Sequence, residues 1–227
     1  SVPSRCCWQH SSPPLPSRAT SAVPVGGWTS GAAVSRAERT GPTGILLAAG
    51  AARRFGGDKL LAPLQDGTPV GAAACRSMHA ALGHVVAVVR PGDDALASVL
   101  AACGATIVHC ARADEGMGAS LACGVAATAD AQGWVVALAD MPWIAPATIR
   151  SVAEAIVAGA SIAAPVHRGE RGHPVGFSAA HRDALMTLSG DEGARSLVAH
   201  GGVELVRIDV DDPGVLRDVD APGDLPG

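Results

Sequence analysis

The sequence predicts an α/β fold in which helices cover both faces of a mostly parallel sheet. From Gly44 onward, short apolar runs alternate with alanine-rich segments of helical length. The apolar runs are continuous instead of alternating with polar residues, which is typical of strands buried on both faces. Regular alternation of such strands with helices favours a parallel sheet.

In the first half of the chain, three unbroken apolar runs of strand length are "GILLAA" (44–49), "HVVAVVR" (84–90) and "ATIVH" (105–109). Alanine-rich segments follow each of them, and we expect helices at about 68–82, 93–103 and 118–129. This order predicts strand and helix in strict succession, so that neighbouring strands run in the same direction.

In the second half, the corresponding runs are "WVVALA" (133–138), "ASIAAP" (160–165) and "VELVRI" (203–208). Helices are expected at about 146–158, 179–188 and 192–200. The segment "GHPVGF" (172–177) predicts a further short strand, antiparallel and near one edge of the sheet. In such sheets ligands bind beyond the carboxyl ends of the strands, so residues just after each apolar run are the candidates for chemistry.

Residues 1–42 differ from the rest, being rich in Ser, Pro and Gly, with four arginines and one acidic residue. Such a composition buries too little apolar surface to offset the entropy lost on ordering. The sequence therefore predicts a disordered N-terminal extension at 1–42 and a single folded domain at 43–227.

Composition also excludes several classes of protein. The net charge is −4 without a long basic block, which argues against nucleic acid or an anionic membrane surface as a partner. No apolar run approaches the length of a membrane span. The cysteines show no C-x-x-C pair and no zinc spacing, and those of the domain are predicted to be buried free thiols of a cytoplasmic protein. These four are Cys75, Cys103, Cys110 and Cys123.

The first candidate motif is "LAAGAARRFGGDK", which follows the first predicted strand and ends on Lys59, the single lysine of the chain. Since arginine is the default basic residue here, a lysine at this position suggests a specific need. Glycines let the backbone approach a ligand, while Arg54 and Lys59 add charge for a polyphosphate. Leu60 follows the lysine, so this is not a Walker-type loop, nor is it a dinucleotide fingerprint. The alternative is a solvated glycine loop.

Two further motifs follow later strands. In "EGMGASL", Gly118 and Ser120 lie at a predicted helix start, where backbone N–H groups bind anions or base edges; the alternative is an ordinary helix entry. In "LADMPWI", Asp140 ends a buried strand, and its carboxylate suits a hard cation such as Mg²⁺. The alternative for Asp140 is a cap on the helix near Pro146, although it stands several residues too early for that.

The last candidates lie in the final third of the chain. "DVDAPGDL" brings Asp218 and Asp220 close together near the carboxy terminus, and its alternative interpretation is a turn into a short final helix. "RGERGHPVGF" and "GDEGAR" offer Arg171, His173 and Arg195 to an anionic acceptor. A core histidine and a helix start are the competing interpretations of these two segments.

Together these segments resemble a known family. The first motif is similar to the L-A-[AG]-G-x-x-x-R-x-G-x-x-K signature of nucleotidyltransferases with a glycosyltransferase-A-like, Rossmann-like three-layer sandwich. The other segments resemble the branch that handles molybdenum cofactor, the MocA-like molybdenum cofactor cytidylyltransferases, which belong to the MobA-like nucleotidyltransferases. The resemblance covers about residues 44 to 225, so it implies that 43–227 is a nucleotidyltransferase domain. Ala221 and Gly223 depart from the threonine and the acidic residue usual at their positions.

The resemblance implies a reaction and a role for each candidate. A cytidylyl group would pass from CTP to molybdopterin, releasing pyrophosphate and giving molybdopterin cytosine dinucleotide. Lys59 and Arg54 would be catalytic. Asp140 and Asp220 would bind Mg²⁺, with Asp218 as the second choice for the latter. Arg171, His173 and Arg195 would bind the acceptor. The residues implied for nucleotide binding are Leu47, Ala48, Ala49, Gly50, Arg54, Lys59, Gly118 and Ser120.

Three other functions stay open at this stage. One is a related transferase that uses GTP or another phosphorylated acceptor. A second is a non-catalytic carrier that delivers molybdenum cofactor to a xanthine dehydrogenase-like enzyme, which would be its client. A third is a general sugar-nucleotide synthase, against which the segments 168–177 and 190–195 count.

Overall fold

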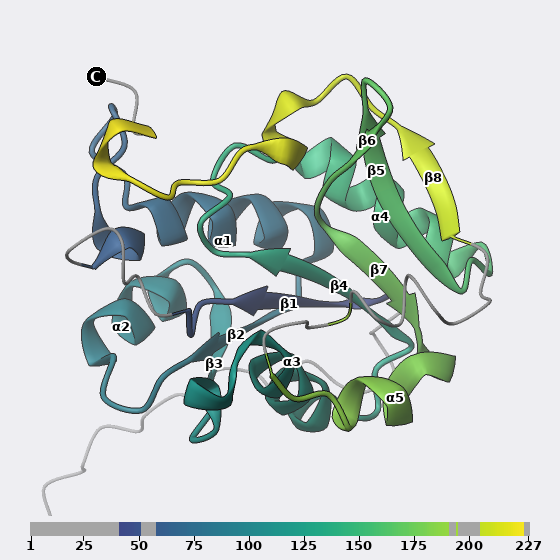
Figure 1. Ribbon diagram of the computed structural model, residues 1–227, viewed down its shortest axis with the longest axis horizontal. Coiled ribbons are helices and arrows are strands. Elements are labelled where there is room, and N and C mark those ends of the chain that lie inside the picture. The colour runs from purple at the N-terminus through teal and green to yellow at the C-terminus, as the bar shows by residue number, and fades with distance from the viewer. Residues whose placement is uncertain (1–40, 51–57, 191–193, 195–204, 225–227) are drawn as a thin grey trace, which may run out of the picture. The chain divides into compact units, whose positions relative to one another are not determined.

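The computed structural model describes residues 41–50, 58–190, 194 and 205–224 (Figure 1). The predicted extension at 1–42 lies almost wholly outside these residues, and its boundary with the domain stays a prediction. The predicted helix at 192–200 also lies outside them, apart from residue 194. Within the described part, no helix is long and apolar enough to cross a membrane.

The amino-terminal half of the sheet is parallel, as predicted. It consists of β1 (Thr43–Leu47), β2 (Val85–Val89), β3 (Ala105–His109) and β4 (Gly133–Leu138). The strand order is β3-β2-β1-β4, and each neighbouring pair runs in the same direction. All four strands therefore end at one edge of the sheet, as the candidate motifs require.

The other half of the sheet is mixed. It contains β5 (Ile162–His167), β6 (Glu170–Arg171), β7 (Val175–Ser178) and β8 (Leu205–Asp209). Strand β7 runs antiparallel to both β4 and β5, while β8 runs parallel to β5.

The predicted edge position of the strand at 172–177 is wrong, because β7 lies between β4 and β5. Its side chains explain why an interior place suits it. Val175 and Phe177 are buried, and a Cβ at Gly176 would lie 2.8 Å from a side-chain carbon of Ile156. The glycine lets a helix pack directly against the strand, which an exposed edge would not need.

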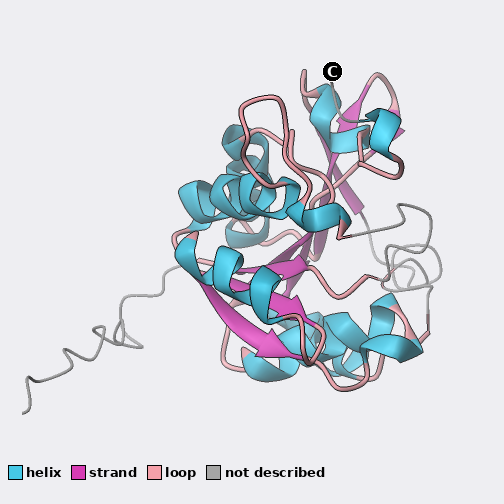
Figure 2. Cartoon of the chain, turned by 90° about the vertical axis from the view of Figure 1, so that its left-hand side faces the viewer, coloured by secondary structure: helices cyan, strands magenta, loops and turns pink. Residues whose placement is uncertain are grey.

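Helices cover both faces of the sheet, as predicted (Figures 1 and 2). The longer ones are α1 (Val70–Leu82), α2 (Asp94–Ala102), α3 (Met117–Ala127) and α4 (Pro146–Val157), and α5 (Arg182–Met186) is short. Short 3-10 turns complete the described part, namely η2 (Lys59–Leu61), η3 (Ala113–Glu115), η4 (Ala179–His181), η5 (Pro213–Leu216) and η6 (Pro222–Asp224).

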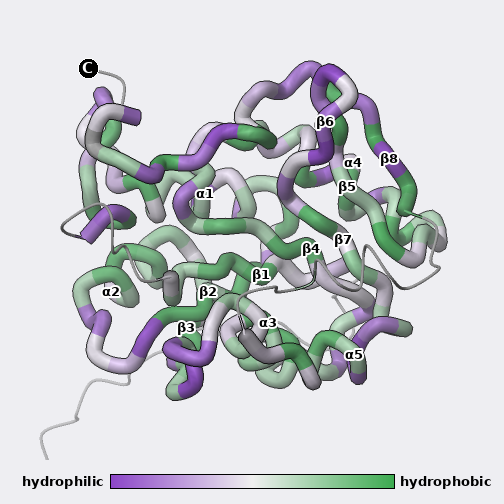
Figure 3. The backbone as a smooth tube through the Cα atoms, in the orientation of Figure 1, coloured by the Kyte–Doolittle hydropathy of each residue, from purple (hydrophilic) through white to green (hydrophobic). Residues whose placement is uncertain are grey.

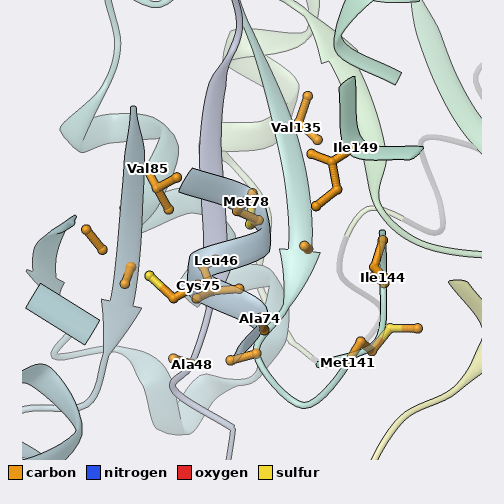
Figure 4. Close-up of a cluster of buried hydrophobic side chains, with 14 of the residues drawn as sticks. Leu46, Ala48, Ala74, Cys75, Met78, Val85, Val135, Met141, Ile144 and Ile149 are labelled. Carbon is orange, nitrogen blue, oxygen red and sulfur yellow. The ribbon is translucent and has the colours of Figure 1, made fainter. Parts of the chain in front are cut away.

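Two apolar clusters fill the space between sheet and helices. Along β1, Leu46 packs into the cluster that includes residues of α1, α2 and α4, and Ile45 packs into the cluster that includes residues of α3 and α5. This alternation follows from the period of two residues along a strand. Figure 4 shows the first cluster, and Figure 3 shows apolar colour along β1, β2 and β4. Both strand faces are thus apolar, which confirms the three-layer α/β class.

The prediction of free thiols is correct for Cys75 and Cys103 but wrong for Cys110 and Cys123, which form a disulfide. Their separation of 13 residues matches no motif that the sequence could reveal. Cys110 follows β3 directly and Cys123 lies in α3, and the return of α3 along the sheet brings their Cα atoms to 5.9 Å. Burial, with the nearby Cys103, raises the pKa of the Cys75 thiol to about 11, which keeps it protonated.

Candidate functional site

The ends of β1 and β4 bring Lys59 and Asp140 together. The two strands are parallel neighbours with Leu47 opposite Leu138, so the segments that follow them lie at the same edge of the sheet. Lys59 Nζ donates a hydrogen bond of 2.8 Å to Asp140 Oδ2. The two side chains are 13% and 23% exposed, so water screens this ion pair only in part.

Three carboxylates form an acidic group beside this lysine. Asp140, Asp218 and Asp220 each offer an oxygen, and these oxygens lie within 4.8 Å of one another. Lys59 Nζ also lies 3.6 Å from Asp220 Oδ1. A backbone hydrogen bond of 2.9 Å from Val219 N to the Asp140 carbonyl holds the carboxy-terminal segment against the end of β4.

This acidic group fits a divalent cation. Asp140 Oδ1 is buried and has no hydrogen-bond partner among the described residues, although a buried carboxylate oxygen is costly to leave unpaired. Partial burial, followed by the carboxylates of Asp220 and Asp140, raises the pKa of Asp218. Clustered carboxylate oxygens are the ligands that Mg²⁺ and similar hard cations prefer, and a cation would relieve both the unpaired oxygen and the mutual repulsion.

The turn that carries Asp220 is ordered by Asp224. The Asp224 carboxylate accepts hydrogen bonds from the backbone N–H groups of Asp220 at 2.9 Å and Ala221 at 2.7 Å. These amide hydrogen bonds lower the pKa of Asp224. The segment therefore keeps a defined turn although Ala221 and Gly223 depart from the family pattern.

The alternative role for Asp140, capping α4, is filled by another residue. Asp212 Oδ2 accepts hydrogen bonds from Ala145 N at 2.9 Å and from Thr148 Oγ1 at 2.7 Å, at the start of that helix. The other oxygen, Oδ1, accepts from Gly214 N at 3.0 Å. Asp212 therefore caps the start of α4, and the Asp140 carboxylate belongs to the acidic group instead.

A first cavity of about 510 Å³ adjoins the acidic group through Asp140. Its wall includes Leu47, Ala48 and Gly50, the residues after β1 that were predicted to contact a nucleotide, together with Lys59. Other lining residues come from the segment after β2 and the start of α2, and they include Arg90 and residues 92–96. Ala49 does not line this cavity, and its side chain is buried.

A second cavity of about 520 Å³ adjoins the acidic group through Asp218. Arg171 and His173 line it, as the prediction of an acceptor site would require. Much of the remaining wall is apolar and comes from β4, β7 and α3, and Leu47 is shared with the first cavity. The acidic group thus borders two cavities of similar size.

Two predicted nucleotide contacts line neither cavity. Gly118 N donates a hydrogen bond of 2.8 Å to the Gly190 carbonyl, and a Cβ at Gly118 would lie 2.7 Å from the Ser189 carbonyl oxygen. Ser120 is buried, and its hydroxyl approaches the Gly116 carbonyl at 3.5 Å. Both residues hold the start of α3 in place here. The predicted site residues Arg54 and Arg195 lie outside the described residues.

Arg90 is a site residue that the sequence reasoning missed. It was counted as the last residue of an apolar run, although a charged residue directly after a strand was the signal being sought. Its Nε donates a hydrogen bond of 2.7 Å to the Ala49 carbonyl, and its Nη1 lies 2.5 Å from Asp114 Oδ1.

Comparison with known proteins finds a family that this chain resembles over most of its length. The family described as MobA-like NTP transferase domain matches residues 44–206. The purine catabolism protein PucB of Bacillus subtilis is 32% identical over 191 residues, which cover 79% of this chain and 91% of that protein. A nicotine blue oxidoreductase of Paenarthrobacter nicotinovorans is 34% identical over 201 residues, which cover 78% of this chain and 91% of that protein.

Solved structures agree with the fold. The crystal structure of Rv0371c from Mycobacterium tuberculosis has 31% identity and a TM-score of 0.71, covering 81% of this chain and 94% of that one. A second structure of Rv0371c, with 30% identity and a TM-score of 0.66, is a complex with manganese, and it covers 81% of this chain and 95% of that one.

Proposed function

Because the chain belongs to the MobA-like NTP transferase family, we propose that it transfers a cytidylyl group from CTP to molybdenum cofactor. The products would be pyrophosphate and molybdopterin cytosine dinucleotide. The coarser activity, nucleotidyl transfer, follows from the family, whereas the choice of CTP and of molybdopterin is the proposal.

The observation that carries the proposal is the position of the acidic group between two cavities. A transferase must hold two substrates with their reacting phosphates at one point. The cavity with small residues and Lys59 suits a nucleoside triphosphate, and the cavity with Arg171 and His173 suits an anionic acceptor with an apolar body. A carrier would need only the second of these.

In the proposed reaction, an oxygen of the terminal phosphate of molybdopterin attacks the α-phosphorus of CTP. A new oxygen–phosphorus bond forms, and the bond from the α-phosphorus to the oxygen shared with the β-phosphate breaks, so that pyrophosphate leaves. The attacking phosphate is already ionised at neutral pH, and therefore no strong general base is required. The barrier comes from bringing two anions together and from charge on the leaving oxygen.

The residues of the site would act by positioning and by neutralising charge. Asp140 and Asp220 would hold Mg²⁺, with Asp218 close enough to contribute. When bound, Mg²⁺ supplies positive charge that stabilises the phosphate oxygens. Lys59 would bind phosphate oxygens from the wall of the first cavity, and we propose the same for Arg54. Arg171, His173 and Arg195 would orient the acceptor.

The experiment is a measurement of pyrophosphate release with CTP, GTP, ATP and UTP in Mg²⁺, each with and without molybdopterin. We expect release only when CTP and molybdopterin are both present. Release with GTP, or with a sugar phosphate in place of molybdopterin, would favour a sister transferase. Binding of molybdopterin without any release would favour the carrier and contradict the proposal.

A matched pair of variants tests the metal assignment. Asp140→Asn should raise the Mg²⁺ concentration needed for half-maximal activity at least about 10-fold, because a neutral amide is a weaker ligand. Asp211→Asn, an equivalent change at an exposed aspartate that is not part of the acidic group, should leave that concentration unchanged. An unaltered Mg²⁺ requirement in Asp140→Asn would remove Asp140 from the metal site.

A further inference from the structure

We infer that Arg90 is a positioning residue that fixes the backbone of the nucleotide site. Its guanidinium joins the loop after β1 to the turn η3, which leads into α3. The inference rests on the proposed function, since it assigns a role within the same nucleotide cavity. It concerns binding of the nucleotide and not the transfer step.

The position of β2 in the sheet makes this bridge possible. Strand β2 lies between β1 and β3, and Arg90 is the first residue after it. A long side chain at that point can reach the segments that follow both neighbours. Arg90 Nε donates to the Ala49 carbonyl at 2.7 Å, and Arg90 Nη1 donates to the carboxylate of Asp114 in η3 at 2.5 Å.

The first of these bonds continues the support of β1 beyond the end of the sheet. Backbone hydrogen bonds hold β1 as far as Ala48, whose N–H donates to the Val88 carbonyl at 2.9 Å. One residue later, the Arg90 side chain binds the carbonyl of Ala49. The residues on either side, Ala48 and Gly50, line the first cavity, so their backbone groups are placed by this bond.

The second bond fixes the guanidinium itself. Asp114 is 87% exposed, whereas the Arg90 side chain is 28% exposed and forms part of the cavity wall. The guanidinium is therefore less accessible to water than the carboxylate that it binds. A guanidinium has donors in two directions and can serve a carbonyl and a carboxylate together. A lysine offers one ammonium centre and would keep only one of the two contacts at full strength.

Arg90 and Asp140 line the same cavity, but the Arg90 side chain binds Ala49 and Asp114 and not the carboxylates of Asp140, Asp218 or Asp220. Its loss should therefore weaken nucleotide binding while sparing both the metal site and the transfer step. This split between KM and kcat distinguishes positioning from a general loss of structure, which would lower the active fraction and reduce kcat.

The test compares Arg90→Gln and Arg90→Lys with the wild-type protein. The dissociation constant of CTP is measured by calorimetry in Mg²⁺, and KM and kcat are measured by pyrophosphate release with molybdopterin. Arg90→Gln should raise the dissociation constant and KM for CTP about 10-fold, as expected for loss of a charge-assisted hydrogen bond, with kcat changed less than about 3-fold. The dissociation constant and KM of Arg90→Lys for CTP should lie between those of the wild type and those of Arg90→Gln. Arg150→Gln, at an exposed position of α4, is the control and should match the wild type.

Two results with Arg90→Gln would each overturn the inference. One is a folded Arg90→Gln variant with wild-type affinity for CTP. The other is a fall in kcat at unchanged affinity, which would give Arg90 a role in the chemical step. If Arg90→Gln does not fold, Asp114→Asn at the exposed end of the pair takes its place and should weaken CTP binding about 3-fold; unchanged binding there would overturn the inference too. If the wild-type protein binds no CTP at all, the proposed function fails and this inference fails with it.

Discussion

Replacement of Lys59 by methionine should make the acidic group bind a divalent cation more tightly while abolishing transfer. The ammonium of Lys59 now lies 2.8 Å from Asp140 Oδ2 and 3.6 Å from Asp220 Oδ1. A metal ion bound by these carboxylates must compete with that ammonium. Methionine keeps the length of the apolar stem but removes the charge, so the competition disappears.

The magnitude follows from the geometry of the ion pair. At 2.8 Å, two unit charges attract by about 1.5 kcal/mol in water and by about 6 kcal/mol at an effective dielectric constant of about 20. The two side chains are only 13% and 23% exposed, but the cost of removing both charges from water offsets much of the attraction, so the net value lies near the lower figure. If the metal no longer has to displace an attraction of about 1.4 kcal/mol between lysine and carboxylate, it should bind about 10-fold more tightly.

Loss of the same charge should destabilise the protein when no metal is present. Three carboxylates would then lie together without a cation, and we expect about 1 to 2 kcal/mol less stability, or about 2 to 8 °C in Tm. Saturating Mn²⁺ should recover most of that loss, because a ligand that binds only the folded state stabilises it.

The assay is a calorimetric titration with Mn²⁺ without nucleotide, together with thermal unfolding at several Mn²⁺ concentrations. Arg76→Met, at an exposed position of α1, is the control and should leave Mn²⁺ affinity unchanged. Equal or weaker Mn²⁺ binding by Lys59→Met would refute the reasoning, since it would mean that Lys59 and the metal do not share the carboxylates.

Three other predictions concern stability and can be checked by urea or thermal unfolding. Thr128→Val should cost about 1 to 3 kcal/mol, because it leaves the buried Trp134 Nε1–H, now 2.9 Å from Thr128 Oγ1, without an acceptor; a loss below about 0.5 kcal/mol would contradict this. Burial lowers the pKa of His181 below the ordinary histidine value of 6.5. The unfolding free energy of the wild type should therefore fall as the pH drops below 6.5, because the unfolded state then binds the proton more readily. His181→Gln should reduce this dependence between pH of about 7.5 and 5.5. If the unfolding free energy of His181→Gln fell as steeply with pH as that of the wild type, His181 would be excluded as the cause. Gly118→Ala should cost about 1 to 3 kcal/mol, since the new Cβ meets the Ser189 backbone, and a neutral result would show that the loop at 188–190 moves freely.

Much of the fold was predictable because the first four strands of the sheet are short and mostly apolar. The runs at 44–49, 84–90, 105–109 and 133–138 coincide closely with β1 to β4. The rule that chemistry follows the ends of parallel strands also singled out Lys59 and Asp140, which the structure brings to 2.8 Å. The same rule would have found Arg90 had it not been counted as part of its strand.

Local sequence by itself determined the strands, most of the helices and the candidate residues after β1 and β4, since each of these depends on neighbours a few residues away. Tertiary structure decided which distant segments meet. It placed β7 between β4 and β5, joined Cys110 to Cys123, and gave the capping of α4 to Asp212. It also brought Asp218 and Asp220 against the end of β4. The physical reason is that such contacts depend on how helices pack and strands pair across the whole sheet, and neither apolar periodicity nor the spacing of residues records that pairing.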